Sequence, residues 1–348
     1  MKKVLAILML LAMVFALAAC GDTPANTPAA NDPTPPPAGD PTPDPAPPPA
    51  ALISVGIVNL HPSESGYREA NVADMDAVFN ETNGYEVKKA NYNEVNEQID
   101  AAQQFITEGV QYLLISGANA EGWTEVLTNA KNAGIKVFLF DRTLNVSEDL
   151  YEAQVISDME AEGKTAVDWL IAQNLDVYNI VHIQGQLGSA AQKGRSGALE
   201  AQIAANDNWN LIFQGTGGDT WSPDEAKRHV ESAIASGKDF NVIYAENDGM
   251  AEGAMFALQD ANITHGVNGK VLIMGFDYNR WALKYVLDGD WNYDGQCSPF
   301  QAKIIDEIIK GVRTVSDKTI INPEGYFDNT NITLELIEAQ GVNEMVRS

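Results

Sequence analysis

The sequence predicts an α/β fold of two similar lobes, each a parallel sheet with helices on both faces, joined by a hinge of several crossing strands. Two observations favour this fold class. From residue 51 onward, short apolar runs alternate with longer amphipathic stretches, which is typical of parallel strands connected by helices. These units are also too many for one ordinary doubly wound sheet and the right number for two.

The apolar runs are the expected strands, and several are apolar on both faces, as burial between two layers of helices requires. They span residues 53–60, 85–92, 111–116, 136–140, 153–157, 178–185, 209–215, 240–246 and 271–276. The segments between them have helical periodicity. In residues 95–109, for example, Ile99, Ala102, Phe105 and Ile106 fall on one face.

The chain is expected to cross between the lobes near residue 157, again near residue 297 and a third time near Pro323. At the second crossing, small residues and a proline interrupt the strand and helix pattern. We therefore assign residues 51–156 and 299–323 to an N-terminal lobe, and residues 157–298 and 324–348 to a C-terminal lobe.

The first fifty residues have the pattern of an export signal and a tether. Residues 1–19 contain two lysines and then an apolar stretch, and Cys20 follows Leu-Ala-Ala, as at the cleavage and lipidation site of a bacterial lipoprotein. An uncleaved membrane anchor is the alternative, which the short apolar span disfavours. Residues 20–50 hold most of the chain's 16 prolines and are expected to form an extended spacer.

Charge and cysteine content exclude several function classes. The formal net charge of −26 opposes binding to nucleic acid or to an anionic membrane, because both attract basic surfaces. The chain has 2 cysteines, so a lipid on Cys20 leaves no disulfide within the chain. Cys297 is then interpreted as a small packing residue.

No motif for catalysis, a cofactor or a metal ion is found. The 4 histidines are scattered, and neither a zinc-protease motif nor a nucleophile elbow is present. No loop has the alternating oxygen ligands of an EF-hand-like calcium site, so no metal is predicted. Asp141 and Glu64 could pair as glycosidase carboxylates, but neighbouring arginines are expected to keep both ionised.

Polar and aromatic residues follow several of the predicted strands. They include Arg68 after the first strand, Asp141 and Arg142 after residues 136–140, Arg195 after residues 178–185, Trp221 after residues 209–215, Asn247 after residues 240–246, and Asp277 after residues 271–276. The carboxyl ends of parallel strands meet at one edge of a sheet, where ligands bind. This inventory suits a polyhydroxylated ligand, because carboxylates accept from hydroxyls, guanidinium groups donate and an aromatic face covers C–H groups.

Each of these residues also has a structural interpretation that stays open at this point. Asp141 and Arg142 could form an ion pair that finishes a strand. Asn247 and the residue after it could cap a helix, and Trp221 could be a core residue. Their coincidence at one edge favours a ligand site.

The body of the chain from about residue 53 resembles a type I, ribose-binding-like periplasmic sugar-binding protein, and most closely the galactofuranose-binding proteins of bacterial ABC importers. The resemblance rests on SESGYR (63–68), NEQIDAAQQFITEGVQYLLIS (96–116), AEGW followed by VLTNAKNAGIKVFLFDRT (120–143), IQGQLGSAAQKGR (183–195), YAENDGM (244–250) and GFD (275–277). Of these, AEGW, FDRT and SESGYR are fairly specific, whereas NDGM alone indicates only the wider class.

The resemblance implies a set of sugar contacts. They are Arg68, Asp141 and Arg142 from the first lobe and Arg195, Asn247 and Asp277 from the second. Tyr67 stands where the family has a tryptophan and is expected to stack on the ring, with further contacts from Ser63 and Glu64. Trp221 is offset by an inserted Thr220, which affects the stacking geometry. Gln296 and Ser298, at the second crossing, are further candidates.

The resemblance also implies the function. The chain is expected to be a lipid-anchored, monomeric binding protein, without enzymatic activity or cofactor. It is expected to capture a galactofuranose-like sugar by hinge closure and deliver it to an ABC permease and ATPase. Another aldose such as galactose, ribose or arabinose is the alternative ligand. A sugar sensor that presents its closed form to a membrane receptor is the alternative function, and a glycoside-acting enzyme is a more remote one.

Overall fold

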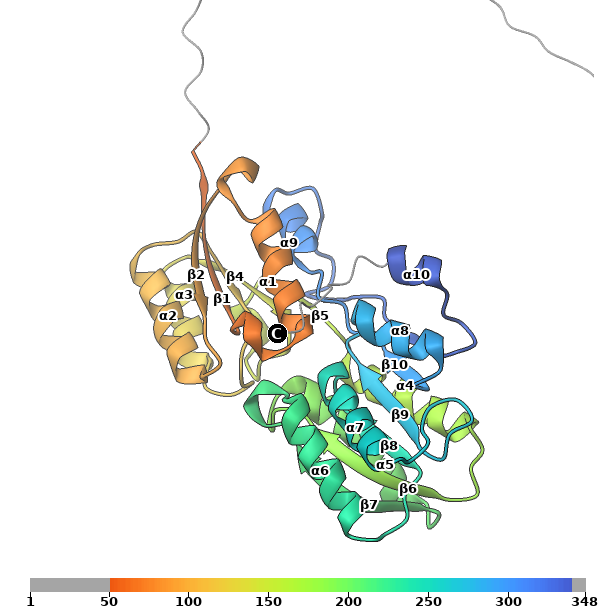
Figure 1. Cartoon of the computed structure of the whole chain (residues 1–348). Helices are drawn as coiled ribbons and strands as arrows, with labels where there is room; N and C mark the ends of the chain where they lie inside the picture. The colour runs from red at the N-terminus through yellow and green to blue at the C-terminus, as the bar shows by residue number, and fades with distance from the viewer. Residues whose placement is uncertain (1–50, 340–348) are drawn as a thin grey trace, which may run out of the picture. The chain divides into compact units, whose positions relative to one another are not determined.

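A computed structural model describes residues 51–339 of the chain, and the predicted signal sequence, Cys20, the tether and residues 340–348 lie outside this range. The first sheet consists of β1 (Ile53–Asn59), β2 (Tyr85–Asn91), β3 (Tyr112–Ile115), β4 (Lys136–Asp141), β5 (Ala153–Ile156) and β11 (Thr319–Ile321). The second consists of β6 (Tyr178–Gln184), β7 (Trp209–Thr216), β8 (Val242–Ala245), β9 (Leu272–Phe276), β10 (Tyr293–Gly295) and β12 (Tyr326–Phe327). The strand orders are β11-β5-β4-β3-β1-β2 and β12-β10-β9-β8-β6-β7 (Figure 1).

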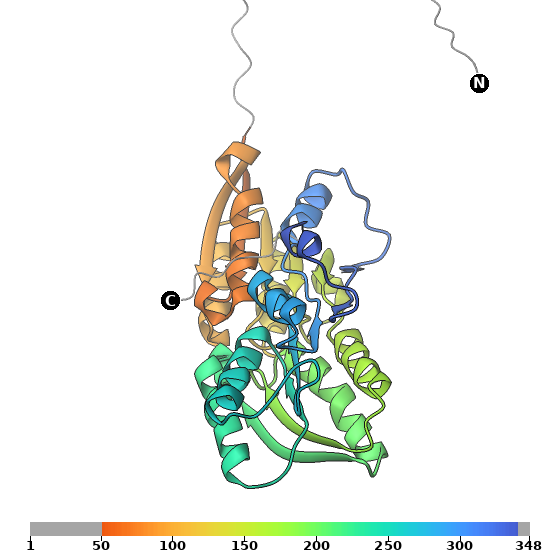
Figure 2. The ribbon, with the colours of Figure 1, turned by 45° about the vertical axis from the view of Figure 1, so that its right-hand side comes forward.

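Helices cover both faces of each sheet (Figures 1 and 2). They are α1 (Gly66–Val78), α2 (Val95–Thr107), α3 (Thr124–Asn132), α4 (Met159–Ala172), α5 (Ala190–Ala205), α6 (Pro223–Ala235), α7 (Asp248–Asp260), α8 (Arg280–Asp288), α9 (Ala302–Ile309) and α10 (Leu334–Ala339). On the first sheet, α2 and α3 pack on one face and α1 and α9 on the other. The predicted fold class is therefore confirmed.

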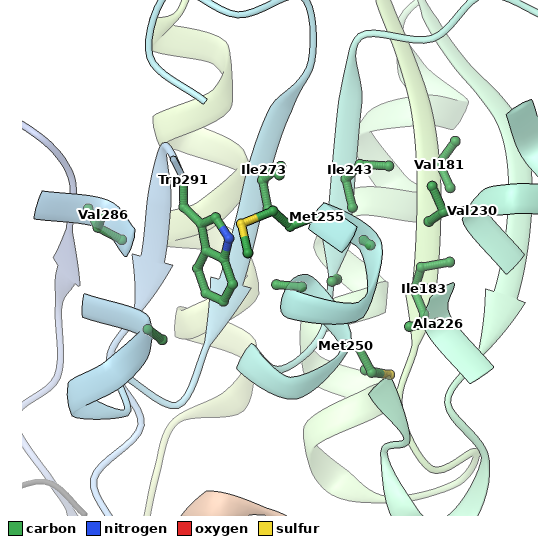
Figure 3. Close-up of a cluster of buried hydrophobic side chains, with 14 of the residues drawn as sticks. Val181, Ile183, Ala226, Val230, Ile243, Met250, Met255, Ile273, Val286 and Trp291 are labelled. Carbon is green, nitrogen blue, oxygen red and sulfur yellow. The ribbon is translucent and has the colours of Figure 1, made fainter. Parts of the chain in front are cut away.

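Side chains alternate between the two faces of the second sheet, as the pleat of a strand requires. Val242 and Tyr244 of β8 pack toward α4 and α5, whereas Ile243 packs toward α6, α7 and α8. Figure 3 shows the second of these layers, where Met255 of α7 and Trp291 pack against the sheet. Burial on both faces explains why these strands read as continuous apolar runs in the sequence.

All nine predicted strands are present, and three short strands were missed. These are β10, β11 and β12, the last of which has only 2 residues. One pairing also departs from the predicted parallel sheets, because β10 and β12 are antiparallel. Strands of two or three residues are too short to give a periodic signal.

The chain passes between the two sheets at three places. It leaves the first sheet after β5, returns between β10 and α9, and leaves again between β11 and β12. The returning helix α9, blue in Figure 1, packs beside α1, which is orange. The residue boundaries given to the two lobes above stay predictions. Within residues 51–339, no helix combines the length and apolar character that crossing a membrane demands.

Candidate functional site

Side chains from both lobes meet in one cavity beside the carboxyl ends of the strands. Its lining consists of Ser65, Tyr67, Asp141, Arg142, Met159, Ala191, Arg195, Trp221, Asp277 and Cys297. The cavity has a volume of about 20 Å³, which is close to the space that a single water molecule needs. The side chains that face the cavity therefore fill most of the space between them.

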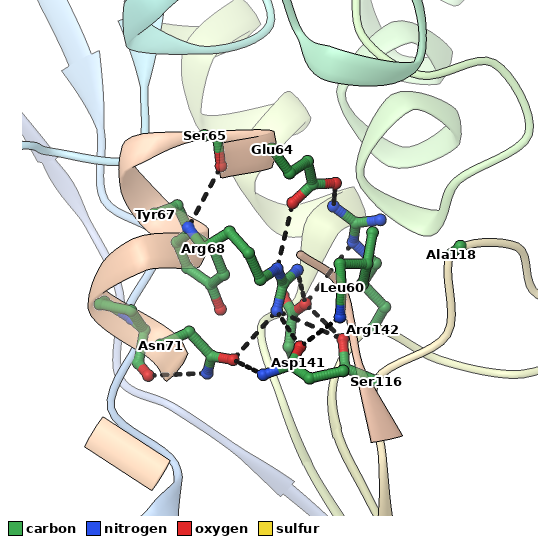
Figure 4. Close-up of polar contacts among 12 residues, drawn as sticks. Leu60, Glu64, Ser65, Tyr67, Arg68, Asn71, Ser116, Ala118, Asp141 and Arg142 are labelled. Carbon is green, nitrogen blue, oxygen red and sulfur yellow. Dashed lines mark hydrogen bonds and ion pairs between the residues drawn. The ribbon is translucent and has the colours of Figure 1, made fainter. Parts of the chain in front are cut away.

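A cluster of four charged residues lies on the first-lobe side of the cavity (Figure 4). Arg68, in α1, donates from Nε to Glu64 at 3.1 Å and from Nη2 to Asp141. Arg142 donates from Nη2 to the other oxygen of Glu64 at 2.7 Å. Two guanidinium groups and two carboxylates thus alternate, so every buried charge in the cluster has an opposite neighbour.

Arg68 supports this cluster from outside the cavity. Helix α1 begins after Ser65, whose Oγ accepts a hydrogen bond from the Arg68 backbone N–H at 3.2 Å. The Nη1 of Arg68 donates to the Oδ1 atoms of Asn59 and Asn71, both at 3.0 Å. The guanidinium is fully buried and does not line the cavity, so its contact with Asp141 is the route by which it acts on the site.

Asp141 is held at the end of β4 in an unusual backbone conformation. Its φ angle is 66°, in the left-handed region that aspartate tolerates better than most residues. Its Oδ2 accepts a hydrogen bond from Ser116 Oγ at 2.8 Å. Burial raises the pKa of Asp141, but Arg68 and Arg142 lower it by more, so its pKa lies below the ordinary value. The expectation that arginines keep Asp141 ionised is confirmed.

Arg142 reaches from the first lobe to the second. Its Nη1 donates to Oε1 of Gln186, in the turn after β6, at 3.4 Å. Its guanidinium carbon also lies 6.0 Å from the centroid of the Trp221 ring, at the limit of a cation–π contact. Arg142 is therefore a direct link across the cavity.

A second set of charges lies on the opposite side of the cavity, around Arg195 of α5. Its Nε donates to Glu162 at 2.8 Å and its Nη2 donates to Asp277 at 3.0 Å, while its Nη1 donates to the backbone carbonyl of Glu246. The guanidinium carbon lies 4.7 Å from the centroid of the Phe276 ring. Arg195 is 2% exposed, so these contacts fix its orientation.

Two glycines set the distance between Arg195 and Glu162. A Cβ atom on Gly163 of α4 would lie 2.5 Å from the Gly194 carbonyl oxygen, and one on Gly194 of α5 would lie 2.4 Å from the Met159 carbonyl carbon. Only glycine permits this approach of the two helices. Glu162, which precedes Gly163, and Arg195, which follows Gly194, are therefore brought within hydrogen-bonding range of each other.

Asp277 follows β9 and also has a left-handed backbone, with φ 99°. It lies on the cavity wall and is 6% exposed. Burial raises its pKa to about 7, although Arg195 lowers it. The two carboxylates of the cavity thus differ, because Asp141 has two arginines and Asp277 has one.

Two aromatic residues complete the lining. Tyr67 donates its hydroxyl to the Ser298 carbonyl at 3.2 Å and accepts from Gln301 Nε2 at 3.1 Å. Trp221 is 4% exposed with φ 51°, and a Cβ on Gly185 would lie 1.8 Å from its ring. A glycine at position 185 is therefore needed for Trp221 to reach the cavity.

The remaining predicted site residues lie elsewhere. Ser63, Glu64 and Asn247 line a neighbouring cavity of about 430 Å³ that shares Ser65 and Trp221 with the first. The Oδ1 of Asn247 caps α7, accepting from the Met250 N–H at 2.8 Å. Gln296 and Ser298 line neither cavity; Gln296 bonds to Gly325, and the carbonyl of Ser298 accepts from Tyr67. The ligand contacts of these residues stay predictions.

Several lining residues were not predicted. They are Ser65, Met159, Ala191 and Cys297. Gln186, the partner of Arg142 across the cavity, was also missed. Gln186 could have been found, because it lies in a turn that directly follows a predicted strand. The other missed residues have small or apolar side chains, which do not indicate a cavity in a sequence. The cavity as a whole presents carboxyl oxygen acceptors, guanidinium donors and aromatic faces, which are the groups that bind sugar hydroxyls and C–H surfaces.

A sequence model described as the periplasmic binding protein domain matches residues 55–304. Among curated proteins, the chain is 34% identical over 261 residues to the galactofuranose-binding protein YtfQ of Escherichia coli (strain K12), covering 73% of this chain and 80% of that protein. The residues matched by the sequence model include strands from both sheets and every residue that lines the cavity.

Solved structures share the fold. A Mycobacterium smegmatis protein in complex with β-D-fucofuranose has a TM-score of 0.73 and 29% identity, covering 80% of this chain and 92% of its own. The binding protein of an arabinose ABC transporter from Shewanella sp. ANA-3, bound to α- and β-L-arabinofuranose, has a TM-score of 0.72 and 27% identity, covering 82% of this chain and 94% of its own.

Proposed function

The chain belongs to the periplasmic binding protein family, and from this premise we propose that it captures a monosaccharide in the cavity between its lobes. Membership of this family implies an exported protein, and its relatives are sugar-binding transport proteins rather than enzymes. The proposed ligand contacts are Asp141 and Arg142 from one lobe and Arg195 and Asp277 from the other.

One observation carries this proposal: two carboxylates and two guanidinium groups, one of each from either lobe, line a single cavity together with Tyr67 and Trp221. Each charge already has a partner of opposite sign. Sugar hydroxyls can therefore replace some of these contacts without leaving a buried charge unpaired, which is the costly outcome in a closed site.

The ring form that we propose is a furanose. The relative from Escherichia coli is named for galactofuranose, and the two solved structures hold fucofuranose and arabinofuranose. A furanose carries some of its hydroxyls on an exocyclic chain, so acceptors and donors spread over two lobes can contact both ends. Galactose and arabinose in this form are the first candidates.

Capture requires the lobes to move. A cavity of about 20 Å³ does not admit a sugar, since it holds about one water molecule. We propose that the three crossings between the sheets act as a hinge, that the open form admits the sugar, and that closure completes its contacts. Hinge closure around a ligand is a known behaviour of periplasmic binding proteins.

A thermal-shift screen tests ligand binding. The purified chain is heated with galactose, arabinose and ribose, each of which equilibrates between ring forms, and with an acyclic polyol of matched size as the control. A ligand at a hundred times its dissociation constant stabilises the folded protein by about 2.7 kcal/mol. We expect a rise in melting temperature with at least one aldose and none with the polyol. If no sugar raises it, the proposal is wrong.

Delivery to an ABC importer and a lipid anchor at Cys20 are the remaining parts of the proposal. The anchor is supported by the sequence Leu-Ala-Ala-Cys after an apolar stretch, and the importer by the relative from the Shewanella arabinose transporter. Metabolic labelling with a tritiated fatty acid tests the first, since Cys20→Ala should abolish the label. Sugar uptake in cells that express an ABC permease and ATPase with the chain, compared with cells that lack the chain, tests the second.

A further inference from the structure

The three crossings between the sheets bring together three residues that are far apart in the sequence. Glu162 lies in the first turn of α4, after the first crossing; Cys297 lies in the second crossing, and Glu324 in the third. One carboxylate oxygen from each glutamate and the Cys297 Sγ all lie within 4.8 Å of one another. Sequence spacing could not indicate such a set, because each member comes from a different hinge segment.

Both glutamates have an oxygen atom that is buried and has no hydrogen-bond partner in the described part of the chain. These atoms are Oε1 of Glu162, a residue that is 5% exposed, and Oε2 of Glu324. The other oxygens are used: Glu162 Oε2 accepts from Arg195 at 2.8 Å, and Glu324 Oε1 accepts from Ser157 Oγ at 2.6 Å and from the Ser298 N–H at 2.7 Å. Unsatisfied carboxylate oxygens are rare in protein interiors and call for an explanation.

The local charge balance also favours a cation. Arg195 pairs with Glu162, but it is shared with Asp277, so no full positive charge is left for Glu324. A divalent cation would supply the missing positive charge, because it favours both carboxylates and the Cys297 thiolate in their ionised forms.

We propose that Glu162, Cys297 and Glu324 bind one divalent transition-metal ion of the zinc class at the hinge. A thiolate ligand with two carboxylates suits zinc better than calcium or magnesium, which take oxygen ligands only. The ligand atoms of a tetrahedral zinc site lie about 3.5 Å apart, so small side-chain rotations complete the geometry. Binding releases the thiol proton and any carboxyl protons to solvent.

The site is accessible and has candidates for further contacts. A cavity of about 260 Å³ is lined by both Glu162 and Glu324 and gives an ion a path to them. The Ser157 hydroxyl, which accepts from Cys297 Sγ at 3.4 Å, lies beside the site, and a water molecule can supply the fourth ligand. An ion held here would join all three crossings, so it would stabilise the folded chain whether or not sugar is bound.

Cobalt(II) tests the proposal, because a cobalt–thiolate bond gives a charge-transfer band in the near ultraviolet. The full chain carries Cys20→Ala, so that Cys297 is the only thiol, and is stripped with a chelator and titrated with Co²⁺ under nitrogen. We expect one equivalent to bind with the charge-transfer band and four-coordinate visible bands, to be displaced by Zn²⁺, and to raise the melting temperature.

Variants separate the site from adventitious binding. Cys297→Ala should remove the charge-transfer band, and Glu324→Gln, which keeps one carbonyl oxygen for Ser157, should weaken the ion's affinity by ~10-fold or more. Glu160→Gln is the matched control, since Glu160 is an exposed acid on the same helix. Absence of the band in the parent chain, or its survival in Cys297→Ala, overturns the proposal, and the parent titration decides even if a variant fails to fold. Sugar binding is measured separately and does not enter this result.

Discussion

Replacing Asp141 by asparagine tests whether the end of β4 holds a buried charge cluster. The substitution keeps the size of the side chain and one oxygen that can accept from Ser116, but it removes the negative charge. In the native protein the Asp141 side chain is 2% exposed, pairs with Arg68 and has its Oδ2 3.5 Å from Arg142 Nε. Asp141→Asn thus leaves two buried guanidinium groups with one carboxylate, that of Glu64.

The expected loss of stability follows from what remains around Arg68. Removing one partner of a buried ion pair costs about 3–5 kcal/mol. Arg68 keeps its bond to Glu64 at 3.1 Å and its bonds to Asn59 and Asn71 at 3.0 Å, so we expect the lower end, about 3 kcal/mol. Sugar affinity should fall by ~10-fold or more, because a hydrogen bond to a charged group contributes about 1.5–3 kcal/mol.

Urea unfolding at neutral pH measures the first effect and calorimetric titration with the sugar found in the screen measures the second. Asp149→Asn is the matched control, since Asp149 pairs with Lys131 at 2.6 Å but is 62% exposed at its side chain. Loss of such an exposed ion pair should change the stability little. If Asp141→Asn is as stable as this control and binds sugar like the native chain, the reasoning about the cluster is refuted. Lost binding with intact stability would assign Asp141 to the ligand alone.

Three further predictions concern the opposite wall, the aromatic lining and the pH profile. Arg195→Lys should lower sugar affinity by ~10-fold or more, because lysine cannot reproduce the planar fork that joins two carboxylates; unchanged affinity by calorimetry would contradict this. Gly185→Ala should weaken sugar binding, because the added Cβ would lie 1.8 Å from the Trp221 ring. Gly197→Ala is the control and should leave sugar binding unchanged, because a Cβ there meets nothing within 4 Å. Equal affinities of the two variants would count against the placement of Trp221. Burial raises the pKa of Asp74 from 3.8 to about 6, so the folded state holds this proton more tightly than the unfolded state, and stability should fall as the pH rises across this interval. Asp74→Asn should flatten that part of the profile in urea unfolding, and an unaltered slope would show that another group is responsible.

The apolar runs predicted the long strands because each is buried on both faces. Residues 136–140, for example, became β4 with one added residue, Asp141. The apolar pattern did not predict the short strands β10, β11 and β12. Tyr293–Gly295 contains an aspartate and a glycine, and becomes β10 only because β9 and β12 lie on either side of it. Tertiary pairing, rather than local pattern, determines such strands.

The candidate site was predicted as far as the geometry of parallel sheets allows. Asp141, Arg142 and Asp277 follow strands, and the carboxyl ends of parallel strands lie together. The sequence does not reveal which polar residue faces a cavity and which serves the fold. Arg68, for example, does not line the cavity, and Asn247 caps a helix. Such outcomes depend on the angle at which each helix leaves its strand, which the sequence pattern does not give.

Nothing in the sequence indicated that Glu162, Cys297 and Glu324 lie close together. No sequence motif singles out Glu162, and Cys297 was interpreted as a small packing residue. Only the three crossings place them beside each other and beside Glu324. Convergence of side chains from three distant segments is a property of topology, and single-sequence patterns are local.

The most direct test of the central claim, that the cavity closes around a furanose, is carbon-13 NMR of arabinose labelled at C1 and mixed with an excess of the purified chain. The anomeric carbon has distinct resonances in the furanose and pyranose rings. The account predicts that the bound sugar gives a furanose signal in slow exchange with free sugar, and that this signal is weaker with Arg195→Lys at the same protein concentration. A bound signal from the pyranose alone would contradict the proposed ring form, and the absence of any bound signal with arabinose or with labelled galactose would contradict sugar capture itself.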